Sequence, residues 1–129
     1  MAMSATQIET IRAAGPTMLH TADGEPSCGL DETYAGWYEL LLDVTKDIEL
    51  ELQKIPEDQR GRYHARQIKT KFGGLCVYMS EYTPAIHDII AAAWALSEVT
   101  CETCGQPGKR RGKGFVFTAC EQHATERPT

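Results

Sequence analysis

Four side chains near the C-terminus have the types and the spacing of a metal site. They are Cys101, Cys104, Cys120 and His123, in the order Cys-x2-Cys, fifteen intervening residues, then Cys-x2-His. Two residues between ligands let both side chains of a pair reach one ion, and the intervening segment is long enough for a hairpin that returns the second pair to the first. Sulfur and imidazole donors favour Zn²⁺, and four of them complete its tetrahedral coordination. The pattern predicts one structural zinc ion per chain.

Catalytic alternatives account for less of this pattern. A Cys-x2-Cys redox motif needs only two cysteines and leaves Cys120 and His123 unexplained. A zinc ion with four protein ligands has no open position for a water nucleophile. The remaining histidines, His20, His64 and His87, are scattered, and the chain has no Ser-His-Asp, paired-acid or deaminase signature. We therefore expect no enzymatic activity.

Two basic segments are candidates for contact with nucleic acid or another anion. The segment between the ligand pairs carries Lys109, Arg110, Arg111 and Lys113. Lys69 and Lys71 precede a Gly-Gly pair, whose backbone N–H groups could also face an anion. Phosphate contacts from these cations would be sensitive to salt. The simpler alternatives are a solvated turn in the first segment and a plain hairpin turn in the second, which lacks the features of a P-loop.

The net charge of −5 at pH 7 is unevenly distributed. Residues 1–60 carry twelve acidic and four basic side chains, whereas residues 61–129 carry six acidic and nine basic ones. An acidic face would repel nucleic acid, while the basic half could tolerate it. The acidic face could serve as a docking surface for a protein or imitate the charge of DNA, and the ordinary alternative is a solvated helix face.

Two amphipathic helices are expected to form the core. Apolar residues recur at helical spacing from Tyr34 to Ile55, and Pro56 lies just past the end. We expect its outer face to carry Glu39, Asp43, Asp47, Glu49 and Glu51. The second helix begins after Thr83, with Pro84 at its first position, and ends near Glu98. Its expected buried stripe comprises Ile86, Ile89, Ile90, Ala93, Trp94 and Ser97.

The remaining elements are a short helix and two hairpins. Ser4 and Gln7 form a capping-box pair that opens an N-terminal helix, which Gly15-Pro16 ends. Alternating residues from 61 to 80 predict a β-hairpin with a Gly73-Gly74 turn. Before the turn, one face carries Ala65, Gln67, Lys69 and Lys71 and the other Arg66, Ile68 and Thr70; after it, Leu75, Val77 and Met79 alternate with Cys76 and Tyr78. A second hairpin, 105–119, joins the ligand pairs, with Phe115-Val116-Phe117 in its returning strand.

These elements predict an α+β fold. Amphipathic helices pack on a small antiparallel hairpin, and a zinc-ribbon-like hairpin forms the C-terminal end. The length of 129 residues fits a single domain. Within it we distinguish an N-terminal helix and loop (1–33), a helix-hairpin-helix core (34–98) and the zinc-binding hairpin (99–124).

Cysteine usage and the apolar runs bear on location. Of the five cysteines, Cys28 and Cys76 remain as free thiols, which suits a reducing compartment. The chain starts without the basic and apolar segments of a signal peptide. The longest apolar run, around residues 89–96, is too short to span a bilayer. We expect a cytoplasmic protein with no membrane partner.

Several motifs also carry a resemblance to a family. They are Gly36-Trp37, the segment 67–75 with Lys71-Phe72-Gly73-Gly74-Leu75, the segment 100–108 around Cys101-x2-Cys104-Gly105, and the segment 118–124 around Cys120-x2-His123. Together they resemble a group of small proteins of bacteriophages, prophages and bacterial genomes. The resemblance covers about residues 34–124 and implies a zinc-binding end and a bacterial or phage setting, but no mechanism. Cys76 departs from the family, which tends to have a polar or charged residue there.

The expected function is a non-enzymatic, zinc-stabilised binding module of phage or prophage type. It would contact a bacterial host protein, for example to inhibit a defence system. One alternative is a nucleic-acid-binding protein that uses the basic hairpin tip, and a second is an enzyme whose site the sequence does not reveal. The sequence leaves open the partner, the oligomeric state and the role of residues 1–33.

Overall fold

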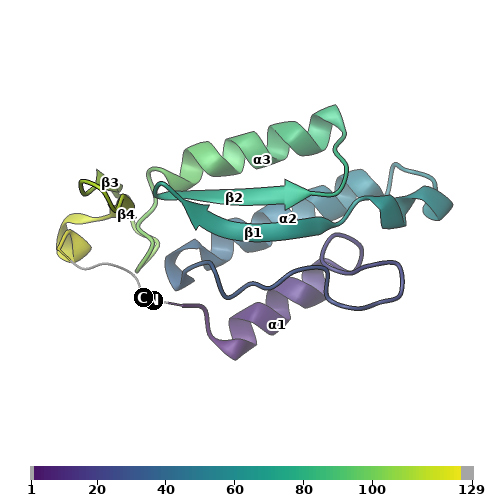
Figure 1. Ribbon diagram of the computed structural model, residues 1–129, viewed down its shortest axis with the longest axis horizontal. Helices are drawn as coiled ribbons and strands as arrows, with labels where there is room; N and C mark the ends of the chain where they lie inside the picture. Colours follow the sequence, from purple (N-terminus) through teal and green to yellow (C-terminus); the bar gives the residue numbers. More distant parts are fainter. Residues whose placement is uncertain (1, 126–129) are drawn as a thin grey trace.

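Three helices and two antiparallel hairpins make up the part of the chain that the computed structural model describes, residues 2–125 (Figure 1). The helices are α1 (Ala5–Ala14), α2 (Tyr38–Leu52) and α3 (Pro84–Ser97), and the strands are β1 (Ala65–Lys71), β2 (Gly74–Met79), β3 (Lys109–Arg111) and β4 (Phe117–Ala119). Short 3₁₀ segments lie at Ala35–Trp37, Glu57–Arg62 and Glu121–His123. The α+β prediction is confirmed.

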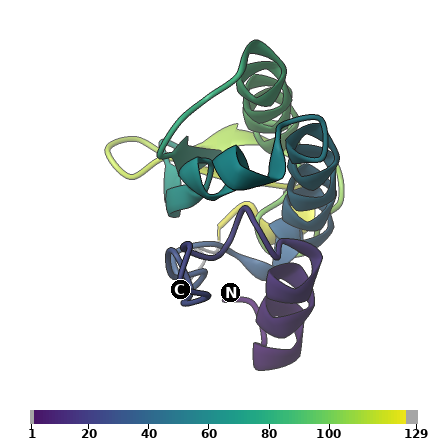
Figure 2. The same ribbon diagram turned by 90° about the vertical axis from the view of Figure 1, so that its right-hand side faces the viewer.

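The helices form one layer and the larger hairpin the other. Seen along its long axis, the molecule has α1, α2 and α3 on one side and β1–β2 on the other (Figure 2). The short β3–β4 hairpin lies at one end of these layers (Figure 1). Helix α2 occupies the middle, so its apolar stripe meets both neighbouring helices and the hairpin; the fully buried members of this region include Trp37, Leu41, Ile48 and Leu52. None of the helices in residues 2–125 is long and apolar enough to cross a membrane.

The predicted helix caps are confirmed. The Ser4 hydroxyl accepts a hydrogen bond from the Gln7 backbone N–H at 3.1 Å, and the Gln7 side chain accepts one from the Ser4 N–H at 2.9 Å. The Thr83 hydroxyl accepts from the Ile86 N–H, and Pro84 occupies the first turn of α3. Each cap satisfies a backbone donor that the first helical turn leaves without an intrahelical partner.

The predicted helix over 34–55 is too long. Residues 35–37 form a 3₁₀ turn, α2 begins at Tyr38, and the helix ends at Leu52 rather than Ile55. The tighter turn brings the Gly36 backbone against the C-terminal segment, with its N–H donating to the Glu102 carbonyl at 2.8 Å. In α3, Ile86, Ala93 and Ser97 are buried as predicted, whereas Trp94, Ile89 and Ile90 are only half-buried.

Glu49 was predicted on the exposed face of α2, and this is wrong. The residue is only 9 % exposed, and its carboxylate accepts hydrogen bonds from the backbone N–H groups of Thr17, at 3.2 Å, and Met18, at 2.7 Å. The segment after α1 turns back across α2 here, and its N–H donors would otherwise be buried without partners. Glu49, which the helical pattern places among the surface acids, therefore accepts hydrogen bonds inside the fold.

The turn of the larger hairpin also differs from the prediction. Lys71 pairs with Gly74, so Phe72 and Gly73, not the two glycines, are the central residues of a two-residue turn. Both have positive φ, 51° and 76°, as a type I′ turn requires. Gly74 is needed for packing instead, because a Cβ there would lie 2.5 Å from the Trp94 ring.

Alternation holds in β2 and breaks in β1. Leu75, Val77 and Met79 are all buried, as predicted. In β1 a register shift between Ala65 and Gln67 places both Ala65 and Ile68 in the core, so the predicted common face of Ala65 with Gln67 and the lysines is wrong. A bulge of this kind adds one residue and moves the side chains beyond it to the other face.

The second hairpin is shorter than predicted. Its returning strand is Phe117–Ala119, and Phe115 and Val116 belong to the connection. Gly112 and Gly114 in this connection have φ of 94° and 76°, backbone angles that L side chains rarely adopt.

The loop between α1 and α2 follows the outer edge of β1, where the Ala65 N–H donates to the Met18 carbonyl and the Thr70 N–H to the Glu32 carbonyl.

Candidate metal centre

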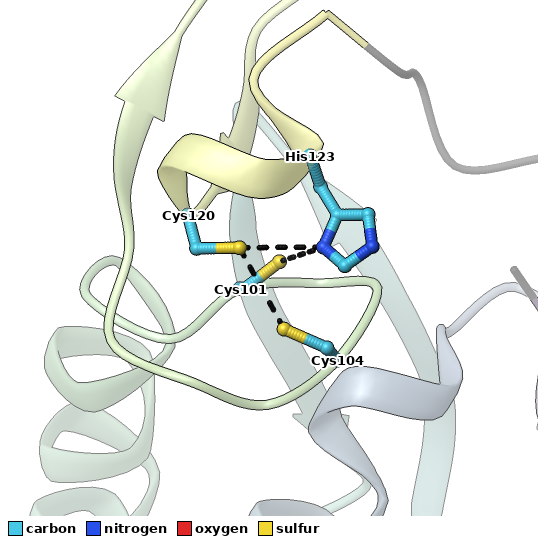
Figure 3. A group of neighbouring side chains, drawn as sticks. All are labelled: Cys101, Cys104, Cys120 and His123. Atoms are coloured by element: carbon cyan, nitrogen blue, oxygen red, sulfur yellow. Dashed lines mark hydrogen bonds between the residues drawn. The ribbon is translucent and has the colours of Figure 1, made fainter.

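The side chains of Cys101, Cys104, Cys120 and His123 point toward one another at the C-terminal end of the fold (Figure 3). Their donor atoms all lie within 4.8 Å of one another. The Cys104 and Cys120 Sγ atoms are 3.7 Å apart, and His123 Nδ1 lies 3.3 Å from Cys120 Sγ and 3.7 Å from Cys101 Sγ. The predicted cluster is therefore present, with Nδ1 as the histidine donor.

These separations match the edges of a metal-centred tetrahedron. With Zn–S near 2.3 Å and Zn–N near 2.0 Å, adjacent sulfurs in tetrahedral coordination are separated by about 3.8 Å and sulfur and nitrogen by about 3.5 Å. The observed distances fall on both sides of these values. The four donors could therefore hold one metal ion, with no remaining position for a substrate or water.

The first ligand pair lies on a tight turn that Gly105 makes possible. The Gly105 N–H donates to the Cys101 carbonyl at 2.9 Å, and the Cys101 N–H donates to the Gln106 carbonyl at 2.8 Å. Gly105 has φ of 80°, and a Cβ there would lie 3.1 Å from the Gly36 carbonyl oxygen. Glycine thus allows both the turn and its close approach to the start of α2.

The second pair flanks a single 3₁₀ turn. Cys120 precedes the turn Glu121–His123, and the His123 N–H donates to the Cys120 carbonyl at 3.1 Å. This turn places the imidazole beside the thiol of the same pair. Strand β4 positions it, because Ala119 at the end of that strand pairs with Lys109 of β3.

The surroundings of the cluster favour the thiolate form at two of its three cysteines, Cys101 and Cys120. Burial raises the pKa of the Cys101 thiol, but hydrogen bonds from the backbone N–H groups of Cys120, Cys104 and Thr103 outweigh it and lower the pKa to about 6. Burial raises the pKa of Cys104. Burial also acts to raise the Cys120 pKa, but a hydrogen bond with His123 lowers it on balance, and the same bond raises the pKa of His123. Thiolates are the metal-binding form, and N–H donors aimed at sulfur stabilise them.

The start of α2 anchors the first ligand turn to the main core. Trp37 is fully buried, and its indole N–H donates to the Thr100 carbonyl at 2.9 Å. A Cβ on Gly36 would lie 2.2 Å from the Cys101 carbonyl oxygen, so only glycine fits. The sequence predicts Trp37 as an apolar position of the helix over 34–55, whereas Gly36 is marked only by the family resemblance. No local pattern links either residue to cysteines more than sixty positions later.

Glu102 is a site residue that the sequence did not predict. It lies between two metal-ligand candidates and is fully buried. One carboxyl oxygen accepts from the Thr118 N–H at 3.1 Å, while the other has no partner among residues 2–125. Burial disfavours the charged form and raises the Glu102 pKa to about 7. A glutamate within a cysteine motif carries no signal of burial in the sequence.

Thr118 joins the metal centre to the larger hairpin. Its hydroxyl donates to the Gly73 carbonyl at 2.6 Å, and its backbone carbonyl accepts from the Glu102 N–H at 2.9 Å. A Cβ on Gly73 would come within 3.4 Å of Val116. The Gly73 turn of the larger hairpin and the returning side of the second hairpin are therefore in contact.

The candidate basic residues are only partly free to contact an anion. Arg110 pairs with Glu98 at 3.2 Å, and Arg111 pairs with Glu121 at 3.1 Å and donates to the Ala119 carbonyl. The Lys71 ammonium lies 5.8 Å from the centre of the Phe72 ring. Lys109 and Lys113 are exposed, and Lys69 is half-buried.

Comparison with protein-family models, curated proteins and solved structures found no match.

Proposed function

We propose that this protein is a non-catalytic protein-binding module whose C-terminal end is stabilised by one zinc ion. Three thiols and one imidazole are the donors that Zn²⁺ prefers, and four protein donors complete its coordination. A complete ligand set supports a structural role, as in small zinc-stabilised domains. The ion would hold together a segment whose own apolar cluster is small, comprising Cys101, Phe117 and Ala119.

The observation that carries the binding role is an apolar groove between α2 and α3. It has a volume of about 460 Å³, and its apolar lining comprises Leu40, Val44, Ile89, Ala92, Ala93 and Leu96. Leu96 is 55 % exposed. A groove whose lining is mostly apolar is the usual form of a site that another molecule occupies.

The partner class follows from the setting that the family resemblance implies. A phage or prophage protein that binds without catalysis acts by occupying a protein of the bacterial host, and inhibition of a defence system is one such use. The acidic character of the first sixty residues supports a protein partner over nucleic acid, because phosphates would be repelled from that face.

A second candidate, nucleic-acid binding, has one specific observation in its favour. The contact of Gly73 with residues 116–118 brings the Phe72 turn, with its exposed aromatic ring, beside the basic hairpin. Exposed aromatic rings next to cations are typical of surfaces that bind single strands. Against this, both arginines of the hairpin are already paired with glutamates.

Affinity capture from bacterial lysate separates the two candidates. The tagged full-length, zinc-loaded protein is compared with Leu96→Glu, which places a charge in the groove. Leu50→Glu is the matched control, because Leu50, on α2, is 66 % exposed and lies outside the groove lining. We expect a bacterial protein that survives nuclease treatment, remains with Leu50→Glu and is lost with Leu96→Glu.

Other outcomes contradict the proposal. Capture that disappears with nuclease, or with Arg110→Ala combined with Arg111→Ala, would replace it with the nucleic-acid function. Equal capture by the wild type and by Leu96→Glu would show that the groove is not the binding surface.

A further inference from the structure

The groove between α2 and α3 has an acidic rim. Asp43 and Asp47 line it from α2, and Asp88 lines it from α3, while no lysine or arginine takes part in the lining. All three carboxylates are exposed. Among residues 2–125, Asp43 and Asp47 have no ion-pair partner, and Asp88 has only the weakly placed His87, 3.9 Å away. The rim therefore carries negative charge that the chain itself does not neutralise.

The groove continues toward the metal centre. A neighbouring hollow of about 560 Å³ shares Leu40, Asp43 and Leu96 with it. From there it extends to the first ligand turn, and its lining includes Glu39, Thr100, Cys104, Gly105 and Gln106. The two hollows thus adjoin along α2, and we call them together the channel; acidic residues line it at positions 39, 43 and 47.

The spacing of these residues suits a helix as the occupant. Glu39, Asp43 and Asp47 follow one another at intervals of four along α2, so they form a row nearly parallel to the helix axis. On the floor, Leu40 and Val44 have the same spacing, as do Ile89 and Ala93 of α3. Rows at this interval form ridges, and the side chains of a third helix can pack into the grooves between such ridges. Lysines or arginines spaced by three or four residues on that helix would face the acidic row.

We infer that the channel binds a cationic amphipathic helix of a partner protein. Leucine- or isoleucine-type side chains of that helix enter the floor between α2 and α3, and flanking lysines or arginines pair with the acidic rim. The apolar contacts supply most of the affinity, and the charges select the partner and orient it. This inference rests on the proposed function as a protein-binding module and specifies the chemistry of its partner.

A designed peptide tests the inference directly. The probe is a fluorescently labelled helix of about 15 to 20 residues, with leucines at i, i+3, i+4 and i+7 and lysines beside them. A matched probe carries glutamates in place of the lysines. Binding to full-length, zinc-loaded protein is followed by fluorescence anisotropy, and the contact surface by amide chemical shifts of ¹⁵N-labelled protein.

Two double variants with the same change in net charge serve as test and control. Asp43→Lys with Asp47→Lys reverses the rim, whereas Glu25→Lys with Glu57→Lys reverses two exposed acids outside the channel. We expect the rim variant to weaken binding of the lysine peptide by about tenfold or more, and the control by less than about threefold. Shift changes should centre on α2 and α3 around Val44 and Leu96.

Three results would overturn the inference. One is equal affinity for the lysine and glutamate peptides. Another is an equal loss of affinity in the two double variants, which would indicate attraction to net charge alone. The third is a dimer of this chain that Leu96→Glu dissociates in light-scattering measurements, since the occupant would then be a second copy. If lysate capture still depends on Leu96 in any of these cases, the proposed function stands and only the partner chemistry is wrong.

Discussion

At the scale of single residues, the cluster of three cysteines and one histidine shows how few side chains can define a candidate metal site. Two short motifs supply all four donors, and the backbone around them supplies N–H groups that lower the Cys101 pKa. The same scale also contains Glu49 and Glu102, acids that the fold uses as internal acceptors. Each of these residues supports a substitution whose effect the geometry predicts.

Replacing Cys104 by serine should release the metal. A hydroxyl is a much weaker zinc ligand than a thiolate, and three remaining donors leave the coordination open. We expect the zinc content to fall from about one per chain to near zero and the melting temperature to drop. Cys76→Ser is the control, because Cys76 is a free thiol outside the cluster. Atomic emission measures the metal content. An unchanged content in Cys104→Ser would contradict the assignment of Cys104 as a ligand.

Glu49→Ala should destabilise the fold by about 1 to 3 kcal/mol. The substitution leaves the Thr17 and Met18 N–H groups without their acceptor, and Met18 is fully buried. Asp47→Ala, two positions earlier on the exposed face, should change the unfolding free energy by less than about 0.5 kcal/mol. Urea unfolding followed by circular dichroism measures both. Similar midpoints for the two variants would show that the Glu49 hydrogen bonds contribute little.

At the scale of elements, the larger hairpin connects the core to the metal centre. Its inner side packs on α3, and its turn reaches β4 through the Gly73 carbonyl and the Thr118 hydroxyl. Two positions of this hairpin, Phe72 and Gly74, differ in what limits their side chains: the backbone angle at Phe72 and the space beside the backbone at Gly74.

Gly74→Ala should cost about 1 to 3 kcal/mol of stability. Its Cβ would lie within 2.6 Å of two atoms of the Trp94 ring, so the strand or α3 must move. Gly61→Ala is the control, because a Cβ there meets only Ala22, at an ordinary 3.6 Å. Thermal unfolding should separate the two variants, and an unchanged melting temperature for Gly74→Ala would show that this contact yields freely.

Phe72→Asn should make the hairpin more stable, by on the order of 1 kcal/mol. Phe72 has φ of 51° in the turn, a backbone angle that asparagine adopts more readily than phenylalanine. The ring is 62 % exposed, so its removal loses little buried area. Denaturant unfolding measures the gain. A loss of stability would show that the contact of the ring with Lys71 contributes more than the turn strain.

At the scale of the whole molecule, metal binding and folding should be linked. The C-terminal end has a small apolar cluster of its own and joins the main core through Trp37, Gly36 and Thr118. Loss of the ion should therefore loosen both the ligand hairpin and the end of the α2–α3 channel, which the first ligand turn lines.

Removing the ion with a chelator should lower the melting temperature, and acid should weaken metal binding. A metal present at about 1,000 times its Kd stabilises the folded state by about 4 kcal/mol. Protons compete with the metal ion for the thiolates. Because the pKa of Cys104 is raised, its thiol must lose a proton when the metal binds near neutral pH. Below about pH 6 the Cys101 thiol is protonated as well and must also lose its proton. The apparent zinc affinity should fall about tenfold per pH unit for each thiol protonated.

Competition with a chromophoric chelator at several pH values measures this dependence, and calorimetry measures the melting temperature with and without metal. A metal-free wild-type protein that melts at the same temperature as the loaded one would show that the cluster does not stabilise the fold.

The sequence by itself determined the features that arise from near neighbours. The ligand set follows from two spacings of two residues, and the caps at Ser4 and Thr83 from hydrogen bonds within one helical turn. These interactions are local, so their pattern is visible in the chain. The alternation of buried and exposed side chains in β2 is equally local, and the prediction for this strand is confirmed. In β1 a bulge interrupts the same alternation, and no residue pattern in the sequence signals it.

Tertiary structure alone decided the features that depend on distant contacts. Glu49 became an acceptor because residues 17 and 18 cross α2, and Gly36 became indispensable because the Cys101 carbonyl lies against it. The groove exists because α3 packs beside α2 and leaves part of both apolar stripes uncovered, and the acidic residues then lie along its rim. Helical periodicity shows that a face is apolar or acidic, but packing decides which part of that face remains open to a partner.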